Sequence, residues 1–221
     1  FAKNWLNVMK ITAAVILSFG FQWYTLKYLP VVDCLPFKKG NDIFELKKMP
    51  ADAIPDKFEY IFIYEKEGKK QEFTMKNLPD STWKFVDRKQ FLVTKGKNNE
   101  PKIKDFDLKT ADGADLTTDV LLQQGTYYLL FIKSTDDLHA DDPWIKEVSA
   151  IAAKEKLFIV TAVPDAARQL FKDNEVLSRL TVLSCDVTAI KTAARAVPTL
   201  YKMNGPVVVE KWSGANFKNV K

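Results

Sequence analysis

The longest apolar run of the chain lies near its N-terminus. Residues 11–21 carry no charge, and between Trp5 and Leu29 the only charged residues are Lys10 and Lys27. A membrane-spanning helix needs about 20 mainly apolar residues, and tryptophan and tyrosine residues at both ends are typical of membrane interfaces. The pattern predicts a transmembrane helix in residues 1–30 that lies in the lipid bilayer over residues 5–29. A cleaved signal peptide and an ordinary buried helix are the alternatives.

The sequence of residues 31–99 predicts a connector followed by a small β unit. The connector, residues 31–57, contains three prolines and a glycine. Aromatic residues then alternate with other residues from Phe58 to Glu65, which is typical of a strand, and the polar stretch after them predicts the turn of a hairpin. A further strand follows Trp83, and the polar run 96–101 marks the end of the unit.

Residues 100–221 alternate between strand and helix patterns after an opening hairpin at residues 103–113. Apolar runs predict strands at residues 127–133, 157–163 and 181–185. Helices are predicted to start at Asp142-Pro143, at Pro164 and at Asp186. Asn204-Gly205 is predicted to join the two final strands as a hairpin. Helical crossovers require parallel strands, so the predicted fold class is α/β.

Composition excludes several classes of protein. The 33 Lys and Arg residues exceed the 28 Asp and Glu residues by only five and are spread along the chain, so nucleic-acid binding is not expected. Two cysteines, Cys34 and Cys185, exclude a disulfide-rich scaffold and a cysteine-based zinc site. The single histidine, His139, excludes a centre with several histidine ligands, and no cofactor is predicted.

The segment AVPTLYKMNGPVVVEKWSG near the C-terminus contains a Val-Pro-Thr sequence, an Asn-Gly hairpin and a following glycine, Gly214. With these motifs the C-terminal half resembles the thioredoxin fold. The opening PKIKDFDLKTADGADLTTDVLL resembles the TlpA-like and peroxiredoxin-like branch. The resemblance implies a thioredoxin-like domain over residues 100–221, with a cis proline at Pro198.

A second resemblance rests on the segment LPVVDCLPFKKG at residues 29–40 and on the β unit that follows it. In these features the whole chain is similar to a group of bacterial DoxX-like membrane proteins. It implies a protein of the bacterial inner membrane whose soluble domain faces the periplasm and binds other membrane or periplasmic proteins. The alternative function is a thiol-redox relay whose working cysteines lie in a DoxX-like membrane region before residue 1.

A thioredoxin-type enzyme needs a cysteine after the first central strand, where a helix N-terminus lowers the thiol pKa. Residues 133–142 contain none, so neither a CxxC mechanism nor a peroxidatic one is expected, and the chain is not predicted to be an enzyme. Cys185 follows a parallel strand. It is either a single reactive or partner-linking thiol or a buried apolar residue, as free cysteines usually are.

The loop of residues 133–142 has three further interpretations. His139 and its neighbouring aspartates are either a cation site or a solvated loop. Ser134 with His139 and an aspartate has the residue types of a hydrolase triad but lacks the G-x-S-x-G sequence. The third hypothesis is a partner-binding groove. In it, as the resemblance to the thioredoxin fold implies, Val197 beside Pro198 offers main-chain groups to an extended segment, and the facing wall carries Ser134, Thr135, Asp136, Asp137 and His139. The aspartates would favour a basic segment. The alternative is that Pro198 has only a structural role. The function predicted overall is a membrane-anchored, non-catalytic binding or assembly module.

Overall fold

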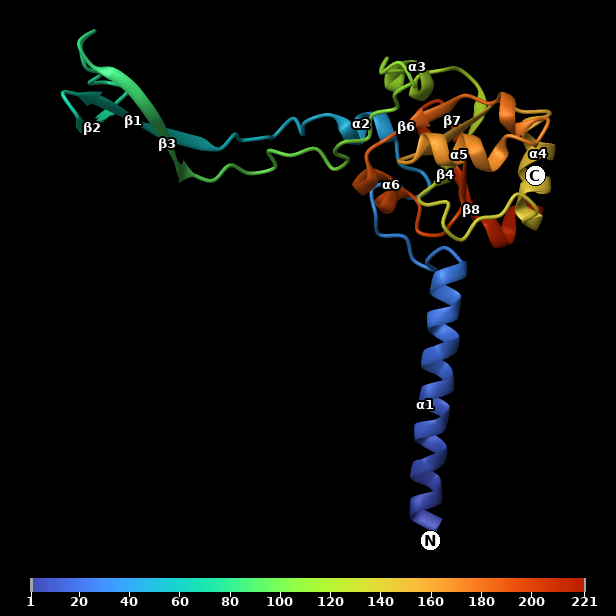
Figure 1. Ribbon diagram of the computed structural model, residues 1–221. Coiled ribbons are helices and arrows are strands. Elements are labelled where there is room, and N and C mark those ends of the chain that lie inside the picture. Colours follow the sequence, from blue (N-terminus) through green and yellow to red (C-terminus); the bar gives the residue numbers. More distant parts are fainter. Residues whose placement is uncertain (1, 221) are drawn as a thin grey trace. The chain divides into compact units, whose positions relative to one another are not determined.

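The computed structural model describes residues 2–220 and divides into two compact units (Figure 1). One unit contains residues 1–47 and 102–221, and the other contains residues 48–101. The second unit is an insertion in the first. The main-chain N–H of Ile103 donates to the carbonyl of Leu46 at 3.0 Å, so the two ends of the insertion leave from neighbouring positions.

The structure overturns the predicted transmembrane helix. The segment does form a helix, α1 (Ala2–Lys27), but none of the helices in the described part of the chain is long and apolar enough to cross a membrane. The uncharged run covers only residues 11–26, fewer than the roughly 20 residues that a span requires. Polar residues within and beside this run, such as Gln22 and Lys10, lower the hydropathy of the longer segment.

The larger unit is built on a five-stranded sheet in the order β6-β5-β4-β7-β8. The strands are β4 (Thr126–Ile132), β5 (Leu157–Thr161), β6 (Val182–Ser184), β7 (Thr199–Asn204) and β8 (Val207–Ser213). The first three are parallel, while β7 and β8 are antiparallel to their neighbours. The α/β class and the predicted alternation of strands and helices are confirmed. The last hairpin turns at Gly205-Pro206, one residue later than predicted.

Helices cover both faces of this sheet. They are α2 (Ile43–Lys47), α3 (Thr117–Leu121), α4 (Pro143–Ala152), α5 (Pro164–Phe171), α6 (Val187–Ala193), and the 3₁₀ helices η1 (Leu177–Arg179) and η2 (Gly214–Asn219). Alternate residues of β4 enter different cores because successive side chains of a strand point to opposite faces. Leu129 packs with residues of α3 and α6, whereas Leu130 packs with residues of α4, α5 and η2.

The segment after α1 packs against the sheet, although its sequence predicts a connector. Phe37 and Ile43 are buried in the core. The main chain of residues 40–43 runs along the outer edge of β8. The N–H of Gly40 donates to Val208, and the N–H of Val208 donates to Asn41. An edge strand with free main-chain groups invites pairing with other chains, and this segment covers part of that edge.

A buried ion pair holds the same segment in place. Lys211 of β8 donates to the carboxylate of Asp33 at 2.6 Å and to the carbonyl of Phe37 at 3.1 Å. Its side chain is only 8% exposed, and the ammonium lies 4.8 Å from the centre of the Tyr201 ring. Burial raises the pKa of Asp33, but hydrogen bonds from Lys211 and from the main chain of Leu35 outweigh it, so the pKa lies below its usual value. Burial lowers the pKa of Lys211, against the opposing effect of Asp33.

The predicted opening hairpin is reduced to isolated bridges. Lys109 pairs with Asp115 and also with Ser184 at the end of β6. Before it, the apolar side chains of Ile103, Phe106 and Leu108 are buried without forming a strand. The apolar pattern that predicts a strand here instead reflects burial of an irregular segment.

The inserted unit is a three-stranded antiparallel sheet in the order β2-β1-β3. Its strands are β1 (Lys57–Lys66), β2 (Lys69–Thr74) and β3 (Lys84–Thr94), as the alternating pattern predicts. Tyr64, Phe73, Trp83 and Phe85 form a chain of edge-to-face aromatic contacts across it. At its base, Ile54 and Lys97 exchange main-chain hydrogen bonds. Among the described residues of this unit none is fully buried.

We predict that Lys211→Met destabilises the larger unit strongly. The substitution leaves the carboxylate of Asp33 without the ammonium of Lys211 in a mainly buried position, and removing one partner of such a pair costs about 3–5 kcal/mol. Chemical denaturation monitored by tryptophan fluorescence measures the change. Lys39→Met is the matched control, because Lys39 pairs with Glu210 on the surface of the same strand, and exposed pairs contribute less than about 1 kcal/mol. Equal losses for the two variants would contradict the assigned role of Asp33.

Candidate functional site

The candidate site lies at one edge of the five-stranded sheet. The carboxyl ends of the parallel strands β4, β5 and β6 meet there, which is where α/β sheets place their sites. Because β7 is antiparallel to β4, it begins at the same edge, and the last residue pair of the two strands is Phe131 with Thr199. Continuing this register by two residues places the start of the 133–142 loop beside Val197. The structure therefore brings together the two segments that the sequence predicts to form a groove.

Close packing against Gly214 holds Pro198 in place. The peptide bond between Val197 and Pro198 is cis, as the sequence motif predicts, and Pro198 is buried. Its carbonyl accepts a hydrogen bond from the N–H of Gly214 at 2.9 Å. A Cβ atom on Gly214 would lie 2.7 Å from Cδ of Pro198, so only glycine fits at this contact.

The main chain of Val197 is a candidate contact for a ligand. Val197 is partly buried and precedes the first residue pair of β7. Within the described part of the chain, no hydrogen bond of its N–H or its carbonyl is found. A donor and an acceptor on one residue at the end of a strand are what an added strand needs.

The loop facing Val197 is held by one of its aspartates. The carboxylate of Asp142 accepts hydrogen bonds from the main-chain N–H of His139 and from the indole N–H of Trp144, both at 3.0 Å. Trp144 is buried, so this carboxylate connects the loop to the core. The carboxylate of Asp142 is therefore occupied by hydrogen bonds that stabilise the loop. Asp137 and Asp141, by contrast, are exposed.

The other polar residues of the loop do not form a catalytic group. The hydroxyl of Ser134 donates to the carboxylate of Asp136 at 2.7 Å, and the main-chain N–H of Asp136 donates back to that hydroxyl. The described hydrogen bonds of His139 are made by its main chain, so Ser134 and His139 are not arranged as a hydrolase triad. Thr135 accepts a turn hydrogen bond from Leu138. No group of metal-ligating residues occurs among the residues that were described.

Cys185 is separated from Pro198 within the sheet. It follows β6, three strand positions away from β7, which corresponds to roughly 14 Å. Its side chain is 8% exposed, and burial raises the pKa of its thiol to about 12. A cavity of about 360 Å³ beside it is lined by three aspartates (Asp105, Asp107, Asp186) and by Lys109 and Ser184. These properties favour a buried apolar role for Cys185 over a reactive one. Cys34 is exposed, and both cysteines are free.

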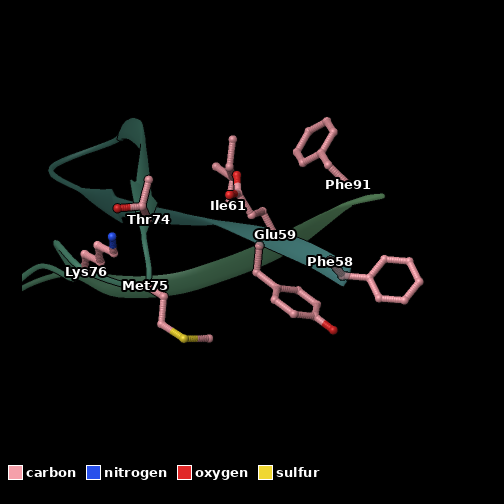
Figure 2. A pocket seen from close by; sticks show the side chains of 8 residues that line it. Phe58, Glu59, Ile61, Thr74, Met75, Lys76 and Phe91 are labelled. Carbon is pink, nitrogen blue, oxygen red and sulfur yellow. The ribbon is translucent and has the colours of Figure 1, made fainter. Parts of the chain in front are cut away.

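A larger cavity, of about 520 Å³, lies in the inserted unit, and the sequence analysis missed it. Figure 2 shows its side chains, with Ile61, Thr74 and Phe91 on one side of the sheet and Met75 on the other. It forms because β1 has ten residues and β2 only six, so β1 continues where β2 ends. The sequence alone does not indicate it, because the difference in length between β1 and β2 becomes visible only in their pairing.

We predict that Gly214→Ala destabilises the site. The new methyl group would push against Pro198, and overpacking of this kind costs about 1–3 kcal/mol. Ser213→Ala is the neighbouring control, because the buried hydroxyl of Ser213 has no hydrogen-bond partner in the part of the chain described, and its removal is expected to be nearly neutral. Thermal unfolding compares the two. A Gly214→Ala variant as stable as the wild type would contradict the packing described.

We further predict that one of the two thiols reacts rapidly in the folded protein. Cys34 is exposed, whereas the thiol of Cys185 is buried with a raised pKa, and thiols react as thiolates. Titration with an aromatic disulfide reagent at neutral pH measures the number of fast thiols. Cys34→Ser should abolish the fast phase, and the thiol of Cys185 should react only on unfolding. A fast phase that persists in Cys34→Ser would show that Cys185 is accessible.

Comparisons with known proteins concern only the inserted unit. The model of a family described as a domain of unknown function (DUF8463) matches residues 58–95, which cover β2, β3 and all of β1 except its first residue. No curated protein matches the chain, and no solved structure matches it. The inserted three-stranded sheet is therefore similar to a family whose function is not described.

Proposed function

We propose that the larger unit is a non-catalytic binding module, whose site at Val197 receives an extended segment of another protein. The observation that carries the proposal is the main chain of Val197, whose N–H and carbonyl have no partner among the described residues and lie beside the first pair of β7. A segment that pairs with the main chain of Val197 would make a short strand-like contact just before β7, whose two sides are occupied by β4 and β8. The resemblance to the thioredoxin fold supports the same site, because that family binds extended segments beside its cis proline.

The charge of the facing loop indicates which segment would bind. Asp136 and Asp137 are exposed and lie in the loop that follows β4. The carboxylate of Asp136 is bonded within the loop only to Ser134, and Asp137 has no ion pair among the described residues. Opposite charges across an interface favour association and select the partner. The proposed partner segment is therefore basic.

The surroundings of the cysteines support a role without thiol chemistry. The loop beside Val197 contains no cysteine, and Cys185 is buried with a thiol pKa raised to about 12. Strand addition needs only main-chain shape, so it does not depend on a thiol. The location of this unit outside the cytoplasm stays a prediction. Fusion of a reporter that is active only in the periplasm to the C-terminus would test it.

The function can be tested with synthetic peptides and the isotope-labelled full chain. One nine-residue peptide alternates valine and lysine, and its counterpart alternates valine and glutamate. We expect the lysine peptide to shift the amide resonances of Val197 and of residues 134–139, and the glutamate peptide to leave them unchanged. The charge reversals Asp136→Lys with Asp137→Lys should weaken binding of the lysine peptide by about tenfold, since they replace attraction with repulsion.

A matched double variant controls for net charge. Asp173→Lys with Glu175→Lys makes the same change in charge beyond the end of α5, which runs back from the site to the opposite edge of the sheet. This variant should bind the lysine peptide as the wild type does. The proposal fails if both double variants bind equally weakly, because the effect would then depend on total charge. It also fails if the amide of Val197 does not respond to either peptide.

A further inference from the structure

One edge of the inserted sheet is only half covered. Strand β3 pairs with residues 57–65 of β1, whereas β2 pairs only with residues 61–66. After Thr74 the chain turns out of the sheet, because the N–H of Asn77 donates to the carbonyl of Thr74. Residues 57–60 of β1 therefore have a strand on one side and no strand on the other. We call these residues the open edge.

The hairpin geometry shows which main-chain groups face outward from the open edge. Glu67 and Gly68 both have positive φ and form a two-residue turn. The residues on either side of this turn, Lys66 and Lys69, therefore exchange two main-chain hydrogen bonds, each donating its N–H to the carbonyl of the other. Main-chain groups then alternate along β1. Those of even-numbered residues point towards β2, and at the open edge these residues are Phe58 and Tyr60.

The alternation continues without a break to Phe58. The two register shifts between β1 and β3 occur where β3 contains an extra residue, at Val86 and at Val93. Strand β1 itself is regular. Among the described residues, no hydrogen bond of the main chain of Phe58 or Tyr60 is found on this side.

The cavity of about 520 Å³ lies along the open edge. Its lining contains apolar side chains on both faces of the sheet, including Ile61 and Phe91 on one and Met75 on the other (Figure 2). Side chains of an added strand would alternate between these two faces. The lining thus offers apolar contact to residues on both sides of that strand.

The charge of Glu59 indicates whether the open edge binds a second copy of this chain or a different partner. It is exposed at the centre of the open edge, between Phe58 and Tyr60, and has no ion pair with any residue that the structure describes. Two copies that paired antiparallel through Phe58 and Tyr60 would place Glu59 directly opposite Glu59. Like charges in that position are destabilising, whereas a Lys or Arg opposite Glu59 is favourable.

We propose that the open edge of β1 binds an extended segment of a partner protein by antiparallel strand addition, and that this segment carries a Lys or Arg between two apolar residues. The basic residue lies opposite Glu59, and the apolar residues lie opposite Phe58 and Tyr60. This surface is separate from the site at Val197, and its test uses different variants.

The test uses the full chain and two fluorescent peptides that differ in one residue. Both consist of alternating threonine and valine, with a central lysine in one and a central glutamate in the other. Anisotropy should show that the lysine peptide binds about tenfold more tightly, as expected when a favourable cross-strand pair replaces a like-charge pair. Glu59→Lys should reverse this preference. Glu67→Lys makes the same change at the tip of the hairpin and should leave the preference unchanged.

Two further measurements test the geometry. Binding should slow hydrogen exchange at the amides of Phe58 and Tyr60 but not at Glu59, whose amide faces β3. N-methylation of the peptide residues that face Phe58 or Tyr60 should abolish binding, whereas methylation of the residue opposite Glu59 should not. Equal binding of the two peptides by the wild type would overturn the proposal. Protection of Phe58 that rises with protein concentration in the absence of peptide would also overturn it, since a second copy would then occupy the edge.

Discussion

The ion pair between Asp33 and Lys211 fixes the path of the chain into the larger unit. The ammonium of Lys211 is nearly inaccessible, and it needs both the carboxylate of Asp33 and the carbonyl of Phe37 to offset the loss of water. These two contacts of Lys211 hold residues 33–37 against β8. Phe37 therefore lies in the core, and residues 40–43 follow the edge of the sheet. Specific packing of the segment after α1 thus depends on one buried cation.

Much of the larger unit could be predicted because its signals are local. Asp186 accepts hydrogen bonds from the N–H groups of Thr188 and Ala189, as a residue before a helix does. Pro143 and Pro164 begin their helices, and β4 and β5 follow apolar runs. The role of Asp33 could not be predicted in this way, since its partner lies 178 residues away in the sequence. The apolar run of α1 was misleading, because it indicates a helix more clearly than it indicates what surrounds the helix.

The candidate site was predictable in part for the same reason. The motif around Pro198 indicated a cis bond, and the order of strands placed the 133–142 loop opposite it. The sequence did not show that Asp142 connects the loop to Trp144, nor that Cys185 lies three strands from Pro198. Both facts depend on side-chain direction and on strand order, which follow from packing. The open edge of β1 depends on a difference in strand length that only pairing makes visible.

The insertion begins and ends at neighbouring points, since Leu46 and Ile103 are joined by a main-chain hydrogen bond and Ile54 and Lys97 by two more. A segment with adjacent ends can be gained, lost or exchanged during evolution without re-threading the sheet into which it is inserted. The larger unit is therefore continuous in space although it is interrupted in sequence, and the hydrogen bond between Leu46 and Ile103 lies where the inserted segment leaves it and returns.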